Sequence, residues 1–151
     1  MNKTVQLGLK ENWALFSLLV LMSAFVGAMV GFERSLLPEL TKEWRIDPLK
    51  SSLFMVISFG LSKALANLLT GQWMQRLGRK RTLVAGWLVA LLTPLLLLWS
   101  PSSAWLLLAN AALGFSQGLT WSATVMMKID LVGPKQRGTA MGLNESADVR
   151  R

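Results

Sequence analysis

The sequence contains no cysteine and no histidine. These absences exclude disulfide bonds, thiol chemistry, Cys/His metal sites and acid–base catalysis by histidine. No nucleophile, base or metal-ligand cluster occurs at a workable spacing in the rest of the chain. We therefore expect no enzyme activity, no catalytic residue, no cofactor and no metal ion.

Charged residues are also scarce, at 16% of the 151 residues against about 25% in an average soluble domain. Hydrophobic residues reach 52%, and runs of 18 or more nearly uncharged residues recur, which indicates transmembrane helices. The net charge is +8, but the basic residues are scattered among apolar runs, so we expect no nucleic-acid partner. The composition predicts an all-α, multi-pass protein of the cell membrane (inner or plasma membrane), with the lipid bilayer as its surroundings.

The apolar runs predict four transmembrane helices, at residues 13–37, 51–74, 82–100 and 105–127. An outer loop at 38–50 and an outer turn at 101–104 alternate with cytoplasmic loops at 75–81 and 128–138. Residues 1–12 form a cytoplasmic N-terminus, and residues 139–151 form the start of a fifth helix that ends early. More basic residues fall in the cytoplasmic segments, Lys128 among them, than in the outer loop, which sets this orientation.

Lys63 lies near the middle of the second predicted span. It is about 12 residues from either end, or roughly 18 Å, which is further than a lysine side chain can reach. Burial at mid-bilayer costs about 2.5–3.5 kcal/mol, so Lys63 must face protein or a water-filled cavity. Asn67 shares its helical face. Lys63 either donates to a neighbouring helix and locks the bundle, or serves as a fixed cation for an anionic group or a titrating acid.

The fourth predicted span carries a polar and aromatic stripe at spacings of four, three, four and three residues, formed by Asn110, Gly114, Gln117, Trp121 and Thr124. Such a stripe indicates a face that lines a pathway, with Gln117 and Trp121 as candidates for substrate contact. Gly114 and Gly118 also form a G-x-x-x-G pattern, which predicts close helix packing.

The first predicted span has a small-residue face that includes Gly27 and Gly31, and this face predicts helix packing. Glu33 and Arg34 follow near its outer end. By helical rise they stand roughly 10 Å above Lys63, so direct pairing with Lys63 is not expected. We interpret Glu33 and Arg34 either as an outer-gate ion pair or as a solvated pair at the interface.

Residues 71–81 resemble the G-x-L-A-D-R-x-G-R-K signature between the second and third helices of the major facilitator superfamily. The matching residues are Gly71, Arg76, Gly78, Arg79 and Lys80, whereas Gln75 replaces the signature aspartate and Trp73 its leucine. Residues 130–145 resemble the family's connection between helices four and five, with its R-G-T-A-x-G turn. The resemblance implies that the 71–81 segment acts in gating and topology.

The family has about twelve spans in two halves, with the substrate bound at the midplane between them. The resemblance implies the N-terminal portion of a secondary transporter, with the first four helices and the start of the fifth. It would move a small solute by alternating access, and Lys63 makes an anionic solute one hypothesis. The residues identify no coupling ion. The candidate pathway residues are Glu33, Arg34, Lys63, Asn67, Asn110, Gln117 and Trp121.

The partner C-terminal half of such a transporter is expected to be missing, so we expect the chain to be inactive alone. The polar residues after Leu143 suggest a reading frame that is interrupted near Ala147. Two alternatives remain: a complete four-helix protein that works as an oligomeric small exporter, and a membrane subunit that does not transport.

Overall fold

The computed structural model describes residues 7–43, 47–99 and 102–148. These residues form five α-helices and one short 3-10 helix, and the described part of the chain has no strand. The elements are α1 (Trp13–Glu43), α2 (Pro48–Leu77), α3 (Arg79–Leu98), α4 (Ser103–Val132), η1 (Pro134–Gln136) and α5 (Arg137–Asp148). The all-α prediction is confirmed.

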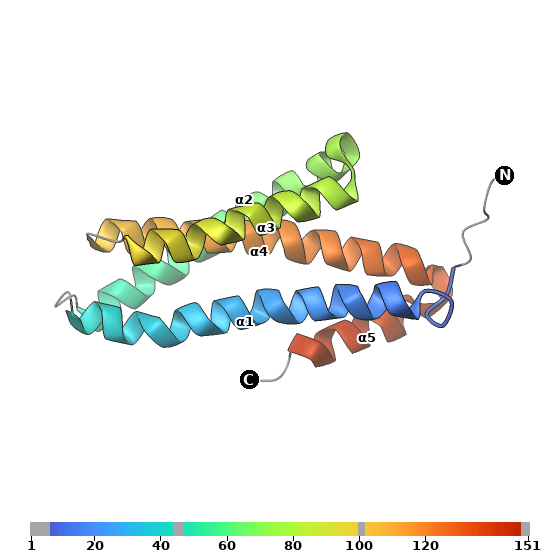
Figure 1. Cartoon of the computed structure of the whole chain (residues 1–151), viewed down its shortest axis with the longest axis horizontal. Helices are drawn as coiled ribbons and strands as arrows, with labels where there is room; N and C mark the ends of the chain where they lie inside the picture. The colour runs from blue at the N-terminus through green and yellow to red at the C-terminus, as the bar shows by residue number, and fades with distance from the viewer. Residues whose placement is uncertain (1–6, 44–46, 100–101, 149–151) are drawn as a thin grey trace.

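The long helices run back and forth along one axis, with α4 placed between α1 and the α2–α3 pair (Figure 1). The start of α1, the α2–α3 turn and the α4–α5 connection lie toward one end of the bundle. The short helix α5 packs beside α1 and α4. This arrangement brings the two segments that resemble family signatures to the same end.

The helices extend beyond the predicted spans. Helix α1 continues through residues 38–43, and α2 begins at Pro48, so much of the predicted outer loop at 38–50 is helical. The Asp47 side chain caps α2 by accepting from the backbone N–H groups of Leu49 and Lys50, at 2.9 and 3.1 Å. Helix α4 likewise starts at Ser103, inside the predicted turn at 101–104. Residues 44–46 and 100–101 lie outside the described residues.

Three of the described helices are long and apolar enough to cross a membrane, at Trp13–Leu36, Leu49–Leu77 and Arg79–Leu98. Helix α4 has 30 residues but is not among these three, and a fourth crossing there stays a prediction. Its polar side chains are nonetheless buried, including Asn110, Gln117, Thr120, Thr124 and Lys128. A helix enclosed by other helices can carry polar groups that find partners inside the bundle.

Helices α2 and α4 pack in parallel, with one contact on each turn. Asn110 Nδ2 donates to the Met55 carbonyl at 2.6 Å, and about three turns further on Ser122 Oγ donates to Asn67 Oδ1 at 2.9 Å. Between these hydrogen bonds, Gly114 lies against the backbone of Phe59, and Gly118 against the backbone of Lys63. The two glycines lack side chains at the positions where the helix backbones approach most closely.

Replacing Gly118 by alanine tests this packing. An added Cβ would lie 2.5 Å from Ala66 Cβ and 2.8 Å from the Lys63 carbonyl oxygen, so the helices must separate. We expect Gly118→Ala to lower the free energy of unfolding by about 1–3 kcal/mol. The measurement is thermal unfolding in detergent micelles.

Gly60→Ala in α2 is the matched control, because an added Cβ there has no neighbour within 4 Å. It should leave the free energy of unfolding within about 1 kcal/mol of the original. Equal stability of the two variants would contradict the close approach at Gly118.

Candidate functional site

The segment that resembles the family signature forms a tight turn between α2 and α3. Gly78 is the one residue between the two helices, and its φ of 83° lies in the left-handed region that favours glycine. The other signature residues Gly71, Gln75, Arg76 and Lys80 are exposed.

Arg79, at the start of α3, forms an ion pair with Asp130 near the end of α4. Both side chains are about half exposed, at 48% and 38%. The pair ties the α2–α3 turn to the segment that leads into α5. Asp130 is absent from the predicted site residues. The sequence feature that could have indicated it is its place at the start of the 130–145 segment, which resembles the family.

Lys128 is buried, which corrects its prediction as a residue of the cytoplasmic loop at 128–138. Helix α4 continues to Val132, and Lys128 has no exposed surface. Its Nζ donates to Ser23 Oγ of α1 at 2.7 Å and to Asn144 Oδ1 of α5. Ser23 Oγ also lies 3.3 Å from Thr124 Oγ1. The ammonium group is accommodated because two other helices supply oxygen acceptors.

Helix α5 is held to the bundle by this polar contact and by the packing of Ala140 on Phe16 and Val132. Ala140 and Asn144 are its buried side chains among those described. Asn144 Nδ2 in turn donates to Glu145 Oε1 at 3.2 Å. The predicted start of a fifth helix at 139–151 is therefore a 12-residue helix, Arg137–Asp148, docked through a buried amide.

Replacing Asn144 by leucine should loosen α5. The change keeps the side-chain size but removes an acceptor of the buried Lys128 ammonium, at a cost of about 1–3 kcal/mol. We expect the amides of α5 to exchange with deuterium about tenfold faster or more. Ser146→Ala is the control, because Ser146 is exposed and bonds only locally to the Leu143 carbonyl. Equal exchange in the two variants would show that Asn144 does not hold α5.

Lys63 and Arg34 approach the same aromatic ring. Lys63 Nζ and Arg34 Cζ each lie 5.8 Å from the centroid of the Phe59 ring. Helical rise predicted that Arg34 stands roughly 10 Å above Lys63 along the bundle. It did not predict that both long side chains approach the ring of Phe59. Phe59 itself is not among the predicted site residues. Its position four residues before Lys63, on the same face of the helix, could have indicated the contact.

Glu33 and Arg34 point in different directions. Glu33 is 3% exposed and faces the interior, whereas Arg34 is exposed. Successive residues of a helix project about 100° apart, which accounts for the difference. No ion pair joins the two side chains in the described part of the chain.

The remaining candidates lie on α4, α2 and α1. Asn110 is buried and bonded to the α2 backbone, so its amide joins helices. Gln117 is also buried, Trp121 is half-buried, and Asn67 is exposed beside Ser122. On α1, Gly27 is half-buried and Gly31 is exposed. An added Cβ at Gly31 would meet no atom within 4 Å, so no contact within the described residues supports its predicted packing role.

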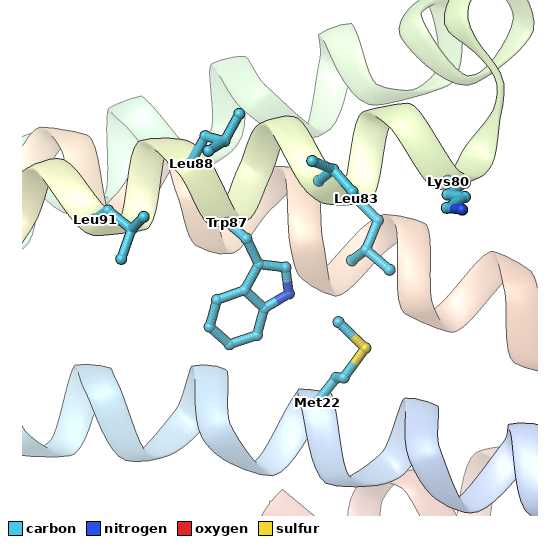
Figure 2. Close-up of a pocket in the computed structure, with 7 residues that line it drawn as sticks. Met22, Lys80, Leu83, Trp87, Leu88 and Leu91 are labelled. Atoms are coloured by element: carbon cyan, nitrogen blue, oxygen red, sulfur yellow. The ribbon is translucent and has the colours of Figure 1, made fainter.

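A groove between α1 and α3 is separate from these polar residues. Figure 2 shows Trp87 of α3 and Met22 of α1 projecting toward each other, with Lys80 at one end. Its other lining residues are Leu83, Val84, Leu88 and Leu91. This apolar lining offers few hydrogen bonds to a polar solute.

Comparison with known proteins agrees with the fold and the two signature segments. The profile of the Major Facilitator Superfamily matches residues 16–148. Human solute carrier family 2, facilitated glucose transporter member 10, is 38% identical over 93 residues, 62% of this chain. Its mouse counterpart is 35% identical over 91 residues, 60% of this chain.

The matched region spans 17% of the length of each of these two relatives. No solved structure matches the chain significantly. The superfamily profile covers most of the sequence and includes both signature segments. The chain is a membrane protein that belongs to the major facilitator superfamily, a family of transporters rather than enzymes.

Proposed function

We propose that this chain supplies the N-terminal helices of a secondary transporter that moves a small solute across the cell membrane by alternating access. The observation that carries the proposal is the place of Lys63, a half-buried lysine inside the apolar helix α2. Its backbone packs on Gly118 of α4 and its ammonium lies near Phe59. A charge in such a position is expensive and therefore favours a functional role.

The solute would pass along the face shared by α1, α2 and α4. Lys63 and Arg34, both near Phe59, supply positive charge for an anionic group of the solute. The neutral pair Asn67 and Ser122 lies one turn further along α2 and α4, where it offers hydrogen bonds. A C-terminal half would form the opposite wall of the pathway.

The Arg79–Asp130 ion pair would act at the cytoplasmic end of this pathway. It connects the turn after α2 to the end of α4, and α4 leads directly into α5. Breaking or forming the pair would couple these helices during opening and closing.

A neutral sugar is the second candidate solute. The two relatives are named facilitated glucose transporters, and the hydrogen-bonded Asn67–Ser122 pair suits hydroxyl groups. The two candidates differ in the role they give Lys63, because a neutral sugar needs no fixed cation.

Uptake by a full-length transporter with residues 1–147 as its N-terminal part tests the role of Lys63. In proteoliposomes, Lys63→Ala should reduce uptake of an anionic solute about tenfold or more, because a buried charge pair is worth several kcal/mol. Lys63→Arg should retain more uptake than Lys63→Ala. Lys50→Ala changes an exposed lysine of the same helix and should have no effect.

Unchanged anion uptake in Lys63→Ala at normal expression would contradict the anionic-solute proposal. Loss of anion uptake with intact glucose uptake would support it. Transport by the 151-residue chain alone would instead support an oligomeric exporter.

A further inference from the structure

The buried face of α1 ends in a carboxylate. Its buried residues recur at spacings of three and four, as Phe16, Leu19, Ser23, Val26, Val30 and Glu33. Glu33 occupies the last position of this stripe with 3% exposure. Its Oε1 has no hydrogen-bond partner among the described residues.

A second buried acceptor lies on the facing side of α4. Ser23 contacts Thr124 and Lys128, so these two residues mark the face of α4 that meets α1. Gln117 is two turns before Thr124 on that same face. It is 9% exposed, and its Oε1 also has no partner within the described part of the chain.

Helical rise places these two acceptors within about 5 Å of the same level along the bundle. Helices α1 and α4 run in opposite directions (Figure 1). From the Ser23–Thr124 contact, Glu33 lies about 15 Å along α1 and Gln117 about 10 Å along α4, at 1.5 Å per residue. Helical side chains lean toward the N-terminus of their own helix, so in an antiparallel pair Glu33 and Gln117 lean toward each other.

One donor placed between Glu33 Oε1 and Gln117 Oε1 would satisfy both of these buried acceptors. A buried carboxylate is strongly unfavourable unless it is protonated or paired with a positive group, and a bound cation would supply that pairing. Lys128 is about 15 Å away, at the level of Ser23, and Arg34 reaches toward Phe59. We propose that Glu33 and Gln117 bind the ammonium group of a zwitterionic solute.

The neighbouring charges favour a zwitterion over a simple cation. Arg34 and Lys63 approach the ring of Phe59, and Arg34 adjoins Glu33 in the chain. Their positive charge weakens binding of a bare cation and attracts an anion. A solute with both groups would place its ammonium at Glu33 and Gln117 and its anionic group near Arg34 and Lys63. This inference rests on the proposed function, which places an anionic group at Lys63.

Thermal unfolding of the 151-residue chain in detergent micelles tests the inference. The probes are β-alanine, its cationic half ethylammonium and its anionic half propionate, at equal concentration and ionic strength. We expect β-alanine to raise the unfolding midpoint by about 3 °C, more than either half. Glu33→Gln should reduce the β-alanine shift to that of propionate, and Gln117→Met should reduce it as well.

Glu39→Gln is the matched control, because Glu39 is an exposed carboxylate of α1 paired with Lys42. It should keep the full β-alanine shift. A full shift in Glu33→Gln, no shift with any probe, or an equal shift with sodium would overturn the ammonium site. A shift with propionate equal to that with β-alanine would also overturn it, while leaving the anionic group at Lys63 intact.

Discussion

The close contact between α2 and α4 is the constraint on which the rest of the structure depends. Gly114 and Gly118 let the two backbones touch, and the hydrogen bonds of Asn110 and Ser122 fix their register. This register sets where each side chain of α2 projects. Lys63 is consequently anchored through its backbone while its ammonium extends along α2 toward Phe59.

The position of α4 in the bundle is explained by the polar side chains that it carries. A polar group exposed to lipid is costly, and α4, whose polar side chains Asn110, Gln117 and Lys128 are buried, lies between α1 and the α2–α3 pair. Lys128 illustrates the consequence, because its ammonium is buried only where α1 and α5 bring Ser23 and Asn144 to it. Asn110, Ser122 and Lys128 of α4 each join this helix to a neighbouring one.

The sequence indicated the long helices but not the polar contacts between them. Apolar run length located the four long helices, because that signal is local. The burial of Lys128 and the Arg79–Asp130 pair depend on residues far apart in the chain, and neither follows from hydropathy. Helical rise could place Lys63 along α2 but not the ring of Phe59 beside it, because that depends on side-chain direction.

Cysteine crosslinking between α2 and α4 tests this account most directly, since the natural sequence contains no cysteine. Asn67→Cys combined with Ser122→Cys places two thiols where the present side chains are hydrogen-bonded at 2.9 Å. Leu68→Cys combined with Ser122→Cys is the control, because Leu68 is 76% exposed on another face of α2. The account predicts a rapid disulfide in membranes for the first pair and none for the second. Equal crosslinking of both pairs, or of neither, would contradict the α2–α4 register.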